Sequence, residues 1–515
     1  MATNQIIMAI VMFVYLAGMV VIGVFYSKKG NSSTSDFYLG GRRLGPLVSA
    51  MSAEASDMSS WLLMGLPGVA YFTGVADAAW TAIGLALGTY FNWLLVAKRL
   101  RVYSEEIGAI TVPGFFSKRF KDDNNILSCI AAIIIIIFFI PYTASGFAAI
   151  GKLFNSLFGF DYMTCMLIGA AVIIIYTLLG GFLAVSTTDL IQSIVMTIAL
   201  FVILGFGVSI AGGWSSVSSV ASSVEGYTSL TSLANVATGE SSSYGFITIV
   251  STLAWGLGYF GMPHILLRFM GAKNPKQIKT SRRIASIWVV ISMGIAIVIG
   301  IVGFAVSKAG GIETFTSSSA AESVVVKIAD VLSNHGVLAV IIAGLVLSGI
   351  LASTMSTSDS QLLTASSSIS EDLLCSVFKL KLSTKATMWV ARISVIVIAI
   401  VAVIFARDPN SSVFQIVSFA WAGFGATFAP VMLCALFWKR CNKWGALAGM
   451  ISGAIVIFLW KYLVRPIGGA WNIYELLPAF IVALIFIIVI SLATGKPDDE
   501  VVDTFNRVKT KTKSI

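Results

Sequence analysis

The sequence predicts an all-α integral membrane protein whose thirteen transmembrane helices form one membrane-embedded unit. Three observations predict this class, and the first is composition. Hydrophobic residues make up 57% of the 515 residues and charged residues only 11%, whereas soluble domains carry about 25% charged residues. The second is that apolar runs of about 20 residues, long enough to cross a bilayer, recur along nearly the whole chain. These runs leave no room for a soluble catalytic domain.

Each apolar run marks one expected helix. The first run is too long for the apolar region of a signal peptide, and no positive charge precedes it, so we expect it to stay as a membrane span. Residues 212–243 are rich in Ser and Gly, and we expect them to form a loosely ordered surface segment. The expected helices span residues 6–26, 44–71, 77–97, 125–153, 162–180, 187–211, 244–270, 284–307, 337–370, 387–406, 413–438, 444–464 and 474–495.

The third observation is that lysines and arginines collect in alternate loops. By the positive-inside rule these loops face the cytoplasm, which places the N-terminus outside and the C-terminus inside. The net charge of +10 is thereby explained by topology, and nucleic-acid binding is excluded because no basic stripe forms. The basic clusters lie within residues 28–43, 98–121, 273–283, 379–392, 439–443 and 496–513.

Two of the expected helices are interrupted by residues that do not suit a continuous membrane span. The second contains SAEASDMSSW from Ser52, with Glu54 and Asp57, and an acidic side chain at this depth needs a polar cavity or a partner. The seventh contains WGLGYFGMPH from Trp255, in which Gly and Pro break the helix. The two lie five helices apart and therefore run in opposite directions. Such paired discontinuous helices indicate the binding site of a transporter built from an inverted repeat.

The ninth expected helix carries hydroxyls that suit sodium. Ser353, Ser356, Thr357 and Ser360 lie on one helical face. Together with carbonyl oxygens released by a facing, unwound helix, they could replace the hydration shell of a sodium ion. The alternative is that these hydroxyls bond their own backbone or hold helices together.

Other polar and aromatic residues at this depth allow two explanations each. Glu54 and Asp359 either line an aqueous vestibule or form structural pairs. Asp189 begins the sixth expected helix, where the helix dipole alone favours an acid. The aromatic residues near the breaks are ordinary packing, or they stack on an apolar ring and hold an ammonium group by cation–π attraction. These aromatic residues are Trp61, Tyr142, Trp255 and Tyr259.

The cysteines and histidines show no pattern typical of a reactive or metal-binding site. Five cysteines and two histidines share no spacing of a disulfide framework, a zinc site or a catalytic triad. We therefore expect no enzyme, no organic cofactor and no metal beyond sodium. A channel is disfavoured because a wide pore needs no paired broken helices.

Four passages carry a resemblance to a known family. They are ASDMSSWLLMGLPG from Ala55, GGFLAVSTTD ending at Asp189, WGLGYFGMPHILLRFM from Trp255, and MSTSDSQLL from Met355. By these passages, in order and on the expected helices, the chain resembles the sodium/solute symporter family, and within it the bacterial members that carry L-proline. Glu54 and Ser60 depart from the family pattern, which has Gly at both positions, and Met262 replaces Gln.

The resemblance implies a LeuT-like fold with a five-plus-five inverted-repeat core in a single membrane domain, 1–515. The first repeat would span 44–211 and the second 244–438. One extra helix, 6–26, would precede them. Two extra helices within 444–495 and a cytoplasmic tail, 496–515, would follow.

The resemblance also implies roles for individual residues. The sodium site would consist of the carbonyl oxygens of Ala55, Met58 and Ser353 and the hydroxyls of Ser356 and Thr357. Asp57 would be essential for sodium affinity, Asp189 would take part in cation handling, and Arg42 would act in coupling. The substrate-binding residues would be Ser59, Trp61, Tyr142, Trp255, Tyr259 and Pro263.

The implied function is secondary active transport, with sodium entry driving uptake of L-proline by alternating access across a bacterial cell membrane. The partners would be sodium, the substrate and the lipid bilayer, with no obligate protein partner. The alternative is a sodium- or proton-coupled symporter of another small solute on the same fold, such as a sugar, pantothenate or another organic acid.

Overall fold

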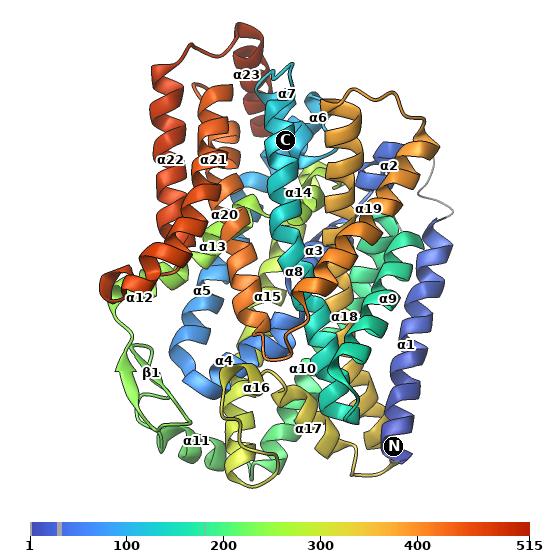
Figure 1. Ribbon diagram of the computed structural model, residues 1–515, viewed down its shortest axis with the longest axis vertical. Helices are drawn as coiled ribbons and strands as arrows, with labels where there is room; N and C mark the ends of the chain where they lie inside the picture. The colour runs from blue at the N-terminus through green and yellow to red at the C-terminus, as the bar shows by residue number, and fades with distance from the viewer. Residues whose placement is uncertain (1–2, 28–32, 180) are drawn as a thin grey trace.

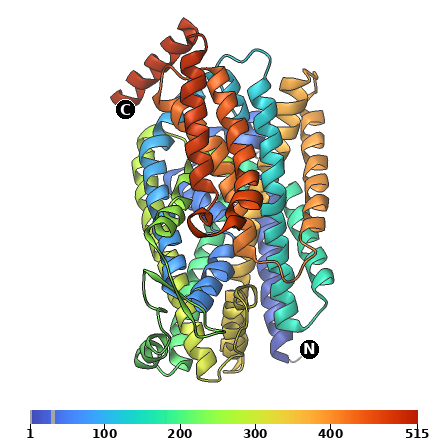
Figure 2. The same ribbon diagram turned by 60° about the vertical axis from the view of Figure 1, so that its left-hand side comes forward.

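The computed structural model describes residues 3–27, 33–179 and 181–515, most of which are helical (Figure 1). Long helices stand side by side along the long axis in both views (Figures 1 and 2). Within the described residues, ten helices are long and apolar enough to cross a membrane, or eleven if the bent pair Phe246–Gly261 and Pro263–Met270 is one span. This arrangement confirms the prediction of an all-α multi-pass membrane protein.

The long helices follow the expected apolar runs, although several extend beyond them. Their bounds are α1 (Thr3–Ser27), α5 (Val75–Phe91) with the π-helix η3 (Asn92–Ala97) and α6 (Lys98–Glu106), α8 (Ile126–Phe158), α9 (Tyr162–Leu179), α10 (Phe182–Ile210), η5 (Pro275–Gln277) with α15 (Ile278–Lys308), α18 (Val337–Ser367) with the π-helix η6 (Ser368–Val377), α19 (Thr384–Phe405), α20 (Val413–Phe437), α21 (Lys443–Leu459) with the π-helix η7 (Trp460–Val464) and η8 (Arg465–Ile467), and α22 (Leu476–Ala493).

Two expected spans fall outside this count because of their lengths. The second expected helix is divided into α3 (Pro46–Asp57), the π-helix η2 (Trp61–Gly65) and α4 (Leu66–Thr73), and the apolar stretch of α9 is short. The two chain ends lie at opposite ends of the molecule (Figure 1), as an odd number of crossings requires. The number thirteen itself stays a prediction.

Short elements that the apolar pattern does not predict join the long helices. Lys28, Lys29 and Gly180 lie outside the described residues. The short elements are α2 (Thr34–Leu39), η1 (Gly40–Arg42), α7 (Val112–Arg119), α11 (Trp214–Ser222), β1 (Ser232–Ala234), β2 (Ser241–Ser243), α16 (Ser318–Ala321), α17 (Val324–Leu332), η9 (Gly469–Trp471) and α23 (Asp499–Ser514).

Residues 212–243 are not the loosely ordered segment that their composition predicts. They form α11 and an antiparallel hairpin in which Ser232 pairs with Ser243. Tyr227 is buried between them, and its hydroxyl donates to the carbonyls of Ala70 and Tyr71, at 2.9 Å each. Tyr227 thus joins the segment to the end of α4, and the amide of Val236 adds a bond to the carbonyl of Phe72 at 3.2 Å, contacts that a Ser- and Gly-rich composition does not reveal.

The second broken helix runs antiparallel to the first, as predicted. It comprises α12 (Phe246–Leu253), α13 (Trp255–Gly258), η4 (Tyr259–Gly261) and α14 (Pro263–Met270). Leu44, two residues before α3, pairs with the residues after α14. Leu44 donates its amide to Gly271 at 3.2 Å, and Lys273 donates to the carbonyl of Leu44 at 2.9 Å. The start of one broken helix therefore lies beside the end of the other.

The C-terminal helix α23 is docked onto α6 and α7 through its apolar face. Phe505 and Val508 are buried, and the guanidinium groups of Arg99 and Arg119 lie 4.7 and 5.2 Å from the centre of the Phe505 ring. Lys121 and Glu500, 2.7 Å apart, add an exposed ion pair. Because such pairs contribute little, the apolar face holds the helix.

We expect Phe505→Ser to release α23. Burial of a phenylalanine side chain stabilises by about 1.5–3 kcal/mol, so amide hydrogen exchange over residues 499–514 should accelerate by roughly ten- to a hundredfold. Asp503→Ser, at an exposed position of the same helix, is the matched control. Equal exchange in both variants would show that the tail is held in another way.

Candidate functional site

The first break frees a backbone carbonyl at mid-helix. α3 ends at Asp57, Met58 has a non-helical ψ of 68°, and the amide of Ser59 turns back to the carbonyl of Asp57 at 2.8 Å. In a continuous helix that amide would instead bond to Ala55, four residues earlier. The carbonyl of Ala55 is therefore available to another helix.

Four of the five expected sodium ligands meet between α3 and α18. The hydroxyl of Ser356 donates to the Ala55 carbonyl at 2.7 Å and lies 3.2 Å from the carbonyl of Ser353. The Thr357 hydroxyl lies 3.5 Å from the same Ala55 oxygen. The fifth, Met58, is the residue at which α3 ends, and no hydrogen bond among the described residues joins it to α18. All five residues are buried.

Asp57 links the two breaks. Its carboxylate is fully buried and accepts a hydrogen bond from the hydroxyl of Tyr259 in η4. Its other oxygen, Oδ1, accepts no hydrogen bond from any residue that the structure describes. The hydroxyl of Tyr142 in α8 donates to the carbonyl of Asp57 at 3.3 Å. The contacts of Asp57 thus reach η4 and α8, whereas those of Ala55 reach α18.

Aromatic rings cover the two breaks. The rings of Trp61 and Trp255 lie 6.5 Å apart, and Trp255 stacks on Tyr474 at 5.1 Å. Tyr259 packs edge-on against Trp421 at 5.0 Å. The indole nitrogen of Trp61 donates to the Asp57 carbonyl at 3.0 Å. The structure therefore brings most of the expected substrate residues into one buried layer.

The remaining two expected substrate residues lie within the breaks themselves. The hydroxyl of Ser59 accepts from the amide of Trp61 at 3.4 Å. Pro263 is the first residue of α14, directly after Met262, whose ψ of 110° interrupts the helix. Pro is favoured at this position because it has no amide hydrogen to leave unbonded.

Asp189 belongs to a separate buried ion pair. Its carboxylate lies 3.1 Å from the guanidinium of Arg268, and the side chains are 0% and 1% exposed. The hydroxyl of Ser52 donates to Asp189 at 2.6 Å, and Arg268 donates to Ser360 at 2.5 Å. The helix-dipole explanation of Asp189 is wrong, because α10 begins at Phe182 and places Asp189 two turns inside it.

Arg268 is a functional candidate that the sequence interpretation missed. Its signal was available, since a single cation inside an apolar segment indicates a buried partner. Its partners come from α3, α10 and α18, so this one side chain joins the second broken helix to three others.

Arg42 clamps the ends of the helices on the basic side of the molecule. It donates to the carbonyl of Met270 at 2.6 Å, to the hydroxyl and carbonyl of Ser104 at 3.0 Å each, and to the carbonyl of Ala109 at 2.8 Å. These contacts tie the end of α14 to the end of α6. Arg42 lies far along the chain from both, which explains why spacing alone could not reveal the clamp.

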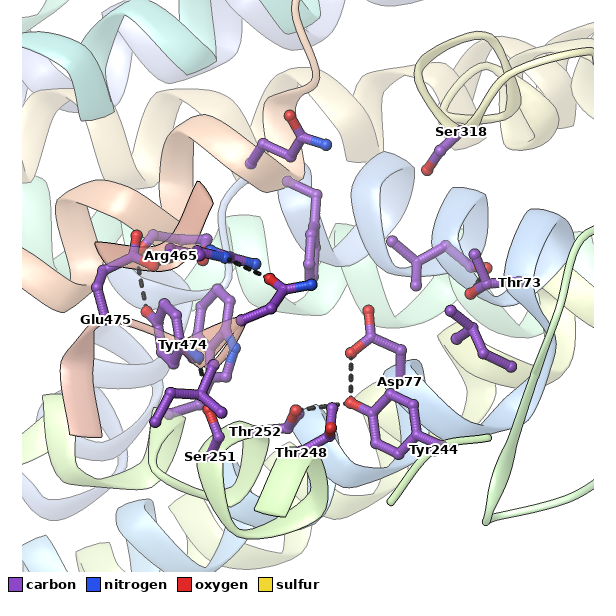
Figure 3. Close-up of a pocket in the computed structure, with 18 of the residues that line it drawn as sticks. Thr73, Asp77, Tyr244, Thr248, Ser251, Thr252, Ser318, Arg465, Tyr474 and Glu475 are labelled. Carbon is purple, nitrogen blue, oxygen red and sulfur yellow. Dashed lines mark hydrogen bonds and ion pairs between the residues drawn. The ribbon is translucent and has the colours of Figure 1, made fainter. Parts of the chain in front are cut away.

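A cavity with charged and polar groups on its walls lies on the other side of the aromatic layer. Its volume is about 860 Å³, and Trp255 and Phe414 line it. Figure 3 shows Asp77 and Tyr244 on one wall and Arg465 and Glu475 on the other. The Tyr244 hydroxyl donates to Asp77 at 2.7 Å, and Arg465 pairs with Glu475 at 2.8 Å. Trp255 also packs on Trp61, so the cavity ends at the layer that covers the first break.

A second buried pair ties α8, α16 and α20 together. Lys152 in α8 lies 2.7 Å from Glu322, which follows α16. The Glu322 carboxylate also accepts from the amides of Val413 and Phe414, at 3.1 Å each, at the start of α20. The loop after α15 is thereby fastened to both α8 and α20.

The comparison with known families agrees with this geometry. A family model described as "Sodium:solute symporter family" matches residues 37–453. The chain belongs to this family. Membership confirms the predicted resemblance and the prediction of a transporter rather than an enzyme.

Curated relatives match over nearly the full chain. A "Sodium/proline symporter" of Haemophilus influenzae is 44% identical over 508 residues, 96% of each chain. The "Osmoregulated proline transporter OpuE" of Bacillus subtilis is 40% identical over 94% of each. A "Sodium/proline symporter" of Staphylococcus aureus is 41% identical over 97% of this chain and 95% of its own.

Solved structures confirm the predicted LeuT-like fold. A sodium-coupled sialic acid symporter superposes with a TM-score of 0.76 at 19% identity, covering 96% of this chain and 99% of its own. The nucleobase-cation-symport-1 transporter Mhp1 gives 0.55 at 13% identity, covering 93% and 99%. MhsT gives 0.52 at 12% identity, covering 87% and 98%.

Proposed function

We propose that this protein couples sodium entry to uptake of L-proline by alternating access. The observation that carries the proposal is the meeting of the freed Ala55 carbonyl with the hydroxyls of Ser356 and Thr357. The relatives named as sodium/proline symporters support the choice of ion and substrate, since they match nearly the whole chain at 41% and 44% identity.

Sodium would bind where these hydroxyls now donate to the Ala55 carbonyl. Hydroxyl hydrogens rotate freely, so both side chains can turn their lone pairs towards an ion. The carbonyls of Ala55, Met58 and Ser353 would complete a shell of five oxygens, the ligand type that hard cations prefer. An ion held in this way would fasten the broken helix to α18.

The carboxylates would act at a distance from this shell. Asp57 would favour sodium through its charge while its bond from Tyr259 positions the second broken helix. Asp189 would influence cation handling through its pair with Arg268. Arg42 would act in coupling, because its clamp must loosen if the ends of α6 and α14 separate.

The substrate would lie between the two breaks. The apolar ring of proline suits the indole and phenol rings of Trp61, Trp255, Tyr259 and Tyr142. Its charged groups would face the polar groups exposed by the breaks, near Ser59 and Pro263. Coupling then follows if sodium raises proline affinity in one of two conformations.

We also propose the membrane arrangement. The core would comprise the repeats 44–211 and 244–438, with one helix before and two after them. The end of the molecule that carries α2, α6, α7 and α23 (Figure 1) would face the cytoplasm of a bacterial cell, since the basic loops collect there.

Uptake of labelled L-proline into proteoliposomes tests the function. We expect accumulation with an inward sodium gradient and none without it. Unlabelled sugars, pantothenate and other organic acids should not compete. Accumulation without sodium would overturn the proposed driving ion, and strong competition by another solute class would overturn the proposed substrate.

We expect Ser356→Ala and Thr357→Ala each to raise the sodium concentration for half-maximal uptake about tenfold, the effect of losing about 1.4 kcal/mol of binding free energy. Ser353→Ala is the matched control. Its hydroxyl donates to Ile350 at 2.9 Å, and its proposed ligand is the carbonyl, which the variant keeps. An equal loss in all three variants would indicate general damage to α18.

A further inference from the structure

A second polar cluster lies where α3 faces α5 and η3. Glu54 is 1% exposed, one turn before Asp57. One carboxylate oxygen accepts from the indole nitrogen of Trp93 at 2.9 Å. The other, Oε2, accepts no well-aligned hydrogen bond from any residue that the structure describes.

Two further oxygens share this environment. Thr89, Asn92 and Trp93 are spaced i, i+3 and i+4, so they lie on one face of the helix. The bond from Trp93 places Glu54 over the same face. Thr89 also lies beside both Glu54 and Tyr259. The Thr89 hydroxyl is within reach of a hydrogen bond with Glu54 and Tyr259, but neither it nor the fully buried amide oxygen of Asn92 makes a well-aligned hydrogen bond among the described residues.

The orientation of Asn92 is fixed by its other amide atom. The side-chain nitrogen of Asn92 donates to the carbonyl of Tyr259 at 2.9 Å. The side-chain oxygen of Asn92 therefore points away from this carbonyl. Tyr259 in turn donates to Asp57. The cluster of Glu54, Thr89 and Asn92 is therefore connected to the first site through one tyrosine.

The second broken helix approaches this face closely. A Cβ atom added to Gly88 would lie 2.3 Å from the carbonyl oxygen of Gly256, so only glycine allows this contact. Gly88 and Asn92 are one turn apart on the same face. Backbone oxygens of α13 thus lie near the side-chain oxygens of the cluster.

Three buried oxygens in one cluster, none with a well-aligned hydrogen bond among the described residues, need an explanation. A buried polar atom without a partner costs about 1–3 kcal/mol, and native structures contain few of them. A buried carboxylate without a cation is less favourable still. One small cation would satisfy the carboxylate, hydroxyl and amide oxygens together, and all three are ligand types that hard cations prefer.

We propose that Glu54, Thr89 and Asn92 form a second sodium site. The role of this second site in transport rests on the proposed function. With both sites occupied, the protein would carry two sodium ions in each transport cycle. Tyr259, which contacts Asn92 through its carbonyl and Asp57 through its hydroxyl, would link occupancy of the two sites.

Direct binding of radioactive sodium to the purified protein tests this proposal. Without proline, we expect the parent to bind two ions. Glu54→Gln should bind one ion as the parent does and the other with at least tenfold weaker affinity. Ser356→Ala should instead weaken binding at the α3–α18 site. Asp77→Asn, which changes a carboxylate of α5 outside this cluster, should still bind two. Thr89→Val, which replaces only the hydroxyl by a methyl group, provides a second test, and we expect it to weaken the binding of one of the two ions.

The outcomes separate this proposal from the proposed function. A parent that binds one ion, or a Glu54→Gln variant that binds two, overturns the second site. A parent that binds one ion and takes up protons at Glu54 also overturns it, since the cluster then serves a proton. A parent protein that binds two sodium ions but does not transport proline would overturn the proposed function and leave the second site intact.

Discussion

Replacing Asp57 with Asn is expected to raise the sodium concentration for half-maximal uptake by roughly ten- to a hundredfold. The variant keeps the shape of the side chain and an acceptor for the Tyr259 hydroxyl, but it removes the negative charge closest to the end of α3. Interactions that involve a buried charge contribute about 1.5–3 kcal/mol, which corresponds to this range of affinity. Sodium-dependent proline uptake in proteoliposomes measures the change.

Two comparison variants make this result specific. Tyr259→Phe removes one hydrogen bond but no charge, so its effect on sodium affinity should be smaller than that of Asp57→Asn. Asp161→Asn removes an exposed carboxylate from the loop between α8 and α9 and should change nothing. If Asp57→Asn reached half-maximal uptake at the same sodium concentration as the parent, a role for Asp57 in sodium binding would be contradicted.

Replacing Arg268 with Met is expected to destabilise the folded protein by about 3–5 kcal/mol, because it leaves the fully buried Asp189 without its cation. The double variant Arg268→Met/Asp189→Asn should recover much of this loss, since no charge is then left unpaired. Thermal unfolding of the purified protein measures both. The pair would thus be a structural requirement of the second broken helix as well as a participant in transport.

The exposed pair of Lys327 and Glu313 provides the matched control for Arg268. Its atoms lie 3.0 Å apart, with side chains 28% and 60% exposed, and Lys327→Met should cost about 0–1 kcal/mol. A double variant at Arg268 and Asp189 that is no more stable than Arg268→Met would show that the loss comes from packing of the long side chain.

The broken helices could be predicted because their cause is local. Acidic residues and the Gly and Pro of the two segments cannot continue an apolar helix, whatever surrounds them. The meeting of Ala55 with Ser356 and Thr357 was also foreseeable in outline, since a helical face of hydroxyls needs a facing partner. Which carbonyl faces it depends on the rotation of α18 against α3, which no spacing fixes.

The interactions that could not be predicted join residues far apart in the chain. Asp189 had a local explanation, Arg268 was not singled out, and only folding shows that they pair. The start of α10 at Phe182 was missed because Ser186, Thr187 and Thr188 lower the hydropathy of its first turns, although they are buried or bonded to their own helix. Tyr227 was missed because its neighbours are Ser- and Gly-rich.

Binding of L-proline to the purified protein, measured with and without saturating sodium, tests most directly the claim that the α3–α18 site couples ion and substrate. We predict at least tenfold tighter proline binding with sodium, and Ser356→Ala should need about tenfold more sodium for the same effect. Equal proline affinity with and without sodium in the parent would contradict the account.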